Sequence, residues 1–252
     1  MLILLTNDDG ILAPGLLAMY RELKKLGEVH VVAPDTVQSA TGHGITVATP
    51  ILTNQVTVGE DFVGTSVGGR PADCVKLAIA KILPRQPDLV ISGINSGANV
   101  GINVIYSGTV AAAIEAAFLG LPAIAVSLYI RNDRPVDYAR TAGLAIETIR
   151  KILEIGLARG QVASVNIPPL LPEENPTGTK IVRQCTRGWA DTYEQRQDPR
   201  GRVYFWNSSV FTLGNTEEDT DVAALRDGYI TITPLQFDLT HYPMLREWES
   251  RD

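Results

Sequence analysis

Short hydrophobic runs alternate with amphipathic segments through the first two thirds of this 252-residue chain. The first run covers residues 2–5 and reads Leu-Ile-Leu-Leu, which is typical of a strand buried on both faces of a parallel sheet. Apolar residues then recur at helical spacing over about residues 15–26, and Gly27 ends that pattern. This alternation predicts an α/β fold in which helices connect the strands of a mostly parallel sheet.

The same patterns place the remaining elements of the first two thirds. We expect strands or extended segments at 29–33, 45–47, 62–67, 89–92, 123–127 and 162–165. We expect helices at 71–83, 108–119 and 136–158. Residues 1–167 therefore form the predicted core domain.

The character of the sequence changes in residues 168–252. Four prolines lie within residues 168–178, which is typical of a surface connection. Short β-like runs follow at 181–184, 203–206 and 229–233. We expect a β-rich hairpin or arm that packs on the core, and it fits either a contact with a partner subunit or an ordinary edge hairpin.

Composition excludes several classes of protein. The net charge of −6 disfavours binding to nucleic-acid polymers through a basic surface. The two cysteines, Cys74 and Cys185, lack metal-site spacing, which argues against a zinc site or a disulfide framework and fits a reducing compartment. No run approaches the roughly 18 apolar residues of a membrane span, and there is no basic leader, so we expect a cytoplasmic protein.

Two adjacent carboxylates, Asp8 and Asp9, follow the first predicted strand. They repel each other and lose hydration there, and a divalent cation with oxygen ligands would compensate. Ligand sites of open α/β sheets lie at the carboxyl ends of strands, where this pair falls. The alternative is an Asx-type turn that caps the next helix.

Two later loops carry further candidate ligands. Ser39 offers a hydroxyl oxygen, and His43 between Gly42 and Gly44 offers a group that titrates near neutral pH. The amide oxygen of Asn95 is a neutral ligand that magnesium or manganese accepts. The alternatives are a loop histidine bonded to a carbonyl, and residues that only supply turns.

Ser107 and Thr109 precede or open the predicted helix at 108–119. Ser107 fits an N-cap, and the free N–H groups of the first helical turn can bind an anion, although a plain cap needs no ligand. A cation beside such an anion site is the arrangement of metal-assisted phosphoryl chemistry. His43 could then protonate the leaving alkoxide or hold a phosphate oxygen.

Other nucleotide and phosphate enzymes fit less well. The sequence has no GxGxxG after its first strand and no GxxxxGK[ST] loop. An aspartyl-phosphate enzyme would need a DxDxT-like run where Asp8 is followed by Asp9, Gly10 and Ile11. A module that binds nucleotide or phosphate without turnover remains the alternative.

Five segments in order carry a family resemblance: LTNDDGILAPG, APDTVQSATGH, RPADCV, ISGINSGANVG and YSGTVAAA. Over about residues 1–130 the chain closely resembles the SurE family. The resemblance implies a Rossmann-like three-layer core and a phosphatase that uses one Mg²⁺ or Mn²⁺ per subunit. It implies nucleoside 5′- and 3′-monophosphates as substrates, polyphosphate as a side substrate, and homodimers or homotetramers with an exchanged C-terminal arm.

The family's functional residues carry over onto matching positions. The metal ligands become Asp8, Asp9, Ser39 and Asn95, with Asp8, Asp9 and His43 as the catalytic residues. The phosphate contacts become Gly42, His43, Asn95, Ser107, Gly108 and Thr109. Two positions depart from the family pattern, since Arg70 stands where threonine is common and Gly44 where serine is common.

Overall fold

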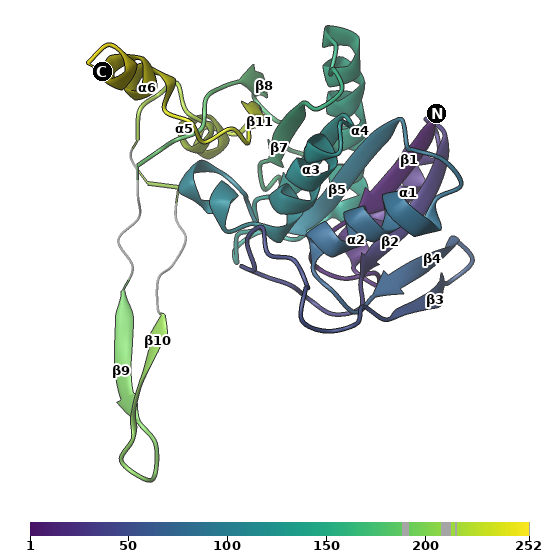
Figure 1. Cartoon of the computed structure of the whole chain (residues 1–252), viewed down its shortest axis with the longest axis horizontal. Coiled ribbons are helices and arrows are strands. Elements are labelled where there is room, and N and C mark those ends of the chain that lie inside the picture. Colours follow the sequence, from purple (N-terminus) through teal and green to yellow (C-terminus); the bar gives the residue numbers. More distant parts are fainter. Residues whose placement is uncertain (188–191, 208–212, 215, 252) are drawn as a thin grey trace.

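The computed structural model describes residues 1–187, 192–207, 213–214 and 216–251, and shows three layers with a sheet between helices (Figure 1). One sheet contains nine strands in the order β3-β4-β2-β1-β5-β6-β7-β11-β8. The strands are β1 (Leu2–Thr6), β2 (Glu28–Pro34), β3 (Thr53–Val58), β4 (Phe62–Val67), β5 (Leu89–Ser96), β6 (Ala123–Leu128), β7 (Val162–Ile167), β8 (Gly178–Ile181) and β11 (Tyr229–Leu235). The helices are α1 (Pro14–Leu23), α2 (Pro71–Leu77) with its continuation η1 (Ala78–Ile82), η2 (Gly101–Ile105), α3 (Gly108–Phe118), α4 (Tyr138–Ile155), α5 (Asp221–Arg226) and α6 (Tyr242–Glu249). The predicted α/β class with a mostly parallel sheet is confirmed.

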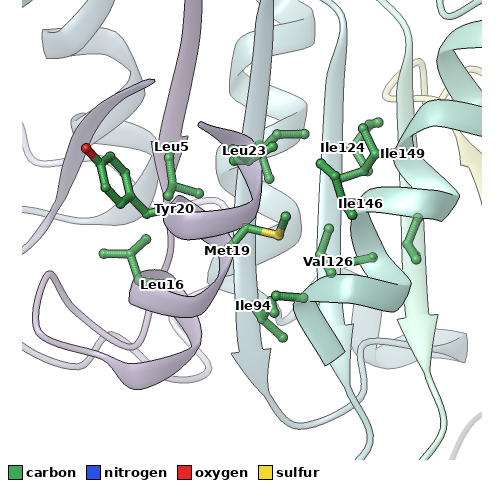
Figure 2. Packing of buried hydrophobic residues seen from close by; sticks show 14 of the residues in the cluster. Leu5, Leu16, Met19, Tyr20, Leu23, Ile94, Ile124, Val126, Ile146 and Ile149 are labelled. Atoms are coloured by element: carbon green, nitrogen blue, oxygen red, sulfur yellow. The ribbon is translucent and has the colours of Figure 1, made fainter. Parts of the chain in front are cut away.

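The two faces of the sheet hold separate hydrophobic cores. Ile3 and Leu5 of β1 face α1 and α4, whereas Leu4 faces α2 and α3, because successive side chains of a strand point to opposite faces. Figure 2 shows side chains of α1 and α4, including Met19 and Ile149, packed over the strands. Burying one such side chain contributes roughly 1.5–3 kcal/mol to the stability of the fold. Packing on both faces of the sheet therefore fixes the positions of the strand ends.

The strand order creates a crevice at one edge of the sheet. From β1 the chain passes through α1 to β2 on one side, and β5 pairs with β1 on the other side, with all three strands parallel. The connections therefore diverge beside the carboxyl ends of β1 and β5, which is where ligand sites of open α/β sheets lie. The Asp8–Asp9 pair follows β1, and Asn95 lies near the end of β5.

The predicted extended segment at 45–47 is wrong. Those residues lie in no strand, and Val47 is 85% exposed. The Asp73 carboxylate holds the segment instead, since it accepts hydrogen bonds from the N–H and the hydroxyl of Thr46 at 3.0 and 2.6 Å. The edge strand at this end of the sheet is β3, whose polar sequence gives little hydrophobic signal.

The tail contributes to the same sheet and also extends away from it. β11 pairs antiparallel with β7 and parallel with β8, so the sheet continues past residue 167. The strands β9 (Tyr193–Gln197) and β10 (Val203–Asn207) form a separate antiparallel hairpin, seen at the lower left of Figure 1. Residues 188–191, 208–212, 215 and 252 of the predicted arm lie outside the described residues. Within the described part, no helix is long and apolar enough to cross a membrane.

Candidate active site

The carboxyl ends of β1 and β5 border an open cleft of about 550 Å³. All four predicted metal ligands line it, together with the N-cap residue of α3; they are Asp8, Asp9, Ser39, Asn95 and Ser107. These residues come from four separate parts of the chain, so only the fold brings them together. The volume lies within the range of small-molecule sites, roughly 300–1,000 Å³.

Asp8 is the most buried of the predicted ligands, with 5% of its surface exposed. Burial raises the pKa of its carboxyl group to about 6, the hydrogen bond from Thr109 opposes this, and the negative charge of Asp9 adds to it. Among the described residues, neither Asp8 nor Asp9 forms an ion pair with a basic side chain. The cleft therefore holds a buried negative charge that a bound cation would stabilise.

The capping alternative for these carboxylates is wrong. Helix α1 begins after Ala13, and no side chain caps it. The turn after β1 is closed by Asn7, whose amide donates to the Gly10 carbonyl at 3.0 Å and accepts from the Gly10 N–H at 3.2 Å. Neither Asp8 nor Asp9 therefore caps helix α1.

Backbone hydrogen bonds bring the neighbouring loops to the cleft. The Gln38 N–H donates to the Asp8 carbonyl at 2.8 Å, which places Ser39 at the cleft wall. The Ser96 N–H donates to Oδ2 of Asp9 at 2.9 Å, and the Asn95 amide nitrogen donates to the Gly97 carbonyl at 2.8 Å. The bond to Gly97 uses the amide nitrogen of Asn95 and leaves the amide oxygen available to a cation.

The N-terminus of α3 lies directly against Asp8. The Ser107 hydroxyl oxygen accepts from the Val110 N–H at 3.0 Å, so the predicted N-cap is confirmed. The Thr109 hydroxyl donates to Oδ1 of Asp8, which assigns Thr109 a role in orienting that carboxylate. A Cβ on Gly108 would lie 2.9 Å from Cβ of Asp8, so glycine is required for this close approach.

His43 lies beside the cleft rather than in its wall. It lines an adjacent cavity that shares Ser107 with the cleft. Its Nε2 is 2.7 Å from Oε2 of Glu115, and its ring stacks on Phe118 with centroids 5.0 Å apart. Gly42 is joined to the same region through its N–H, which donates to the Tyr106 carbonyl at 3.0 Å.

The two departures from the family pattern are in contact with each other. A Cβ at Gly44 would lie 1.6 Å from Nη1 of Arg70, so the missing side chain makes room for the guanidinium group. The long side chain of Arg70 therefore occupies the space that a side chain at position 44 would need.

The donor set fits a hard divalent cation. Two carboxylates, one hydroxyl and one amide oxygen are ligands of the kind that magnesium and manganese accept. Among the described residues, no group of three or more His, Cys, Asp or Glu side chains could hold a metal.

Sequence reasoning missed three contributors to this region. Glu115 carries no signal beyond a single acidic residue in an alanine-rich helix, and its partner His43 lies 72 residues away. Asn99 also lines the cleft, where its amide donates to the Ser127 hydroxyl at 2.8 Å. Asn207, the last residue of β10, reaches the cleft from the hairpin.

Comparisons with known proteins show the family to which this chain belongs. Residues 3–191 match the family model described as Survival protein SurE. A protein named 5′-nucleotidase SurE from Carboxydothermus hydrogenoformans is 48% identical over 250 residues, covering 98% of this chain and 94% of that protein. One of the same name from Christiangramia forsetii is 44% identical over 257 residues, covering 99% and 96%. The crystal structure of the SurE protein from Aquifex aeolicus superposes with a TM-score of 0.83 at 38% identity, covering 98% of both chains. The chain therefore belongs to the SurE family.

Proposed function

We propose that this protein is a 5′-nucleotidase: a metal-dependent phosphatase that hydrolyses nucleoside 5′- and 3′-monophosphates to nucleoside and phosphate. The observation that carries the proposal is the meeting of Asp8, Asp9, Ser39 and Asn95 in one cleft beside the N-terminus of α3. The relatives named 5′-nucleotidase SurE support the same class of substrate.

The cleft residues divide into cation ligands and phosphate ligands. Asp8, Asp9, Ser39 and Asn95 would hold one Mg²⁺ or Mn²⁺ per subunit. When bound, the cation supplies positive charge to the phosphate oxygens and lowers the pKa of a coordinated water. Ser107 and the N–H of Gly108 would hold phosphate oxygens, because the first turn of a helix attracts anions.

His43 and Thr109 have supporting roles in this proposal. Thr109 fixes the orientation of Asp8 through its hydroxyl group. His43 gives a proton to the leaving alkoxide, which a nucleoside needs because its 5′-oxygen is a poor leaving group without protonation.

The charge of the cleft favours a single phosphomonoester over a long polyanion. No lysine or arginine lies among the described residues that line it. We therefore propose polyphosphate as a side substrate only, and we expect no binding to nucleic-acid polymers or membranes by this cytoplasmic enzyme.

We also propose that the protein is a homodimer or homotetramer that uses the tail. The hairpin exposes aromatic side chains, among them Phe205 and Trp206, and helix α6 has no buried residue among those described. Exposed apolar surface of this kind is typical of subunit contacts.

Phosphate release from a substrate panel tests the proposed activity. The purified chain, freed of metal and then given Mg²⁺ or Mn²⁺, should release phosphate from 5′-AMP and 3′-AMP faster than from polyphosphate. Tight binding of AMP by calorimetry with no phosphate release under any metal would overturn the proposal in favour of a binding module.

A further inference from the structure

Glu115 is a buried carboxylate that the metal site does not use. It lies in the second half of α3, where every neighbour in the sequence is apolar, and only 5% of its surface is exposed. A lone ionised carboxylate in such a place costs several kcal/mol unless it is paired. Its position on the helix that also carries Thr109 links it to the site.

Both oxygens of Glu115 are occupied by side chains from other elements. Oε2 lies 2.7 Å from Nε2 of His43, and Oε1 lies 3.2 Å from Nζ of Lys76 in α2. Burial alone would raise the pKa of this carboxyl group, but the hydrogen bonds from His43 and Lys76 outweigh burial and lower it. Glu115 is therefore ionised at neutral pH, and an ionised carboxylate only accepts hydrogen bonds.

This pairing decides which nitrogen of His43 carries the proton. Because Glu115 can only accept, Nε2 must be the donor, and the neutral ring keeps Nδ1 unprotonated. The face of the ring packs on Phe118 at an interplanar angle of 9°, and Phe118 packs edge-on against Phe237. Within the described part of the chain, Nδ1 has no hydrogen-bond partner, so it remains available to a ligand.

We propose that Glu115 is a positioning residue that holds His43 in the Nε2–H tautomer, so that Nδ1 exchanges the proton with the substrate. The inference rests on the proposed function and extends it. As water attacks phosphorus, the new P–O bond forms and the bond to the nucleoside oxygen breaks. Solvent protonates Nδ1 of this tautomer before the step. The resulting imidazolium ring gives the Nδ1 proton to that oxygen and returns to the Nε2–H tautomer, and the attacking water loses a proton to solvent.

The inference predicts different effects on two substrates that differ in their leaving groups. A nucleoside alkoxide needs a proton as it leaves, whereas p-nitrophenolate does not. Glu115→Gln removes the charge, and its amide can donate as well as accept, so it permits both tautomers of His43. We expect kcat/KM for AMP to fall at least about tenfold, a fraction of the 10²–10⁴ range of general acid catalysis. With p-nitrophenyl phosphate the value should stay within about twofold.

A double-variant comparison tests whether Glu115 acts through His43. In the His43→Ala background, Glu115→Gln should cause no further loss with AMP, because the group it positions is already gone. Glu147→Gln is the matched control, since Glu147 is an exposed helical glutamate, and its kcat/KM should equal that of the unchanged protein. Equal losses on both substrates, or losses that multiply in the double variant, would overturn the inference.

Nitrogen NMR of the His43 ring gives a readout that does not depend on turnover. The two ring nitrogens of the unchanged protein should show the shifts of a single Nε2–H tautomer, and Glu115→Gln should bring them closer together. A mixture of tautomers in the unchanged protein would overturn the inference. The proposed function fails separately, if the unchanged protein releases no phosphate from AMP with any metal.

Discussion

The carboxyl edge of the sheet and the β9–β10 hairpin show opposite relations between polarity and burial. At the edge, polar side chains such as Asp8 and Asn99 are buried and held by hydrogen bonds. In the hairpin, aromatic side chains such as Tyr193, Phe205 and Trp206 are exposed on both strands. Both regions are unusual, because folded proteins normally expose charged groups and bury aromatic ones. A buried charge and an exposed aromatic surface each cost free energy.

The two regions therefore favour two different kinds of partner. A pair of adjacent carboxylates, of which Asp8 is buried, is stabilised by a small cation, whereas an exposed aromatic surface is stabilised by another protein surface. A two-stranded hairpin alone is marginal in water, so the arm has a further reason to need contacts. Substitutions in the two regions should therefore affect different measurements.

The largest expected effect is on activity and comes from the edge. Asp9→Asn keeps an acceptor for the Ser96 N–H but removes the negative charge. We expect kcat/KM for AMP to fall at least roughly a hundredfold, the scale of losing a main electrostatic contribution to catalysis. Asp133→Asn, an exposed aspartate paired with Arg131, is the control. Near-unchanged turnover by Asp9→Asn would exclude it as a ligand.

The next effect is on stability and comes from Asp8. Its pKa is about 6 in the fold and 3.8 in the unfolded chain, so the fold disfavours the ionised form. In metal-free protein, this group's contribution to the free energy of unfolding is lost as pH rises from about 4 through 6. Asp8→Asn should therefore be more stable than the unchanged protein at pH 8, by roughly 2–3 kcal/mol, and equal to it near pH 4.

Denaturant unfolding in EDTA at the two pH values measures this difference. Asp133→Asn again serves as control, because that carboxylate is exposed. A variant that is less stable than the unchanged protein at pH 8 would show that Asp8 supports the fold rather than a ligand.

Substitutions at Phe205 and Trp206 of the arm should affect assembly rather than the stability of the subunit. Replacing Phe205 and Trp206 with serine should convert the proposed oligomer to a smaller species in analytical ultracentrifugation. Since both side chains are exposed, the free energy of unfolding of the subunit should change by about 0.5 kcal/mol or less for each. Unchanged sedimentation would remove these residues from the subunit contact.

The smallest effect is expected at Gly44, which borders the site without belonging to the cation ligands. Gly44→Ala would place a Cβ against the flexible end of Arg70, which can move away. We expect less than about 1 kcal/mol of destabilisation in thermal unfolding, and none when Arg70 is also replaced by alanine. A loss that persists in the double variant would show that the backbone itself resists the change.

The sequence was sufficient where a signal is local. The apolar run at residues 2–5 and the spacing around Val110 predict β1 and α3, because strand and helix periods are properties of neighbouring residues. Asp8 and Asp9 could be placed at the edge of the sheet because they directly follow a buried strand.

The remaining features depend on contacts between distant residues. The pairing of β11 with β7 joins parts of the chain more than 60 residues apart, and the pairing of His43 with Glu115 spans 72. β3 begins Thr-Asn-Gln and is exposed, so no hydrophobic period marks it. Helices α5 and α6 were not predicted, since α5 is only six residues long and α6 buries none of its described residues.

Titration of the metal-free protein with Mn²⁺ tests most directly whether the carboxyl edge is a cation site. The ion's paramagnetic resonance signal distinguishes bound from free manganese at each addition. We predict one bound ion per subunit in the unchanged protein and at least about tenfold weaker binding in Asp9→Asn, with Asp133→Asn unaffected. Equal binding by the unchanged protein and Asp9→Asn, or no binding by either, would contradict the account.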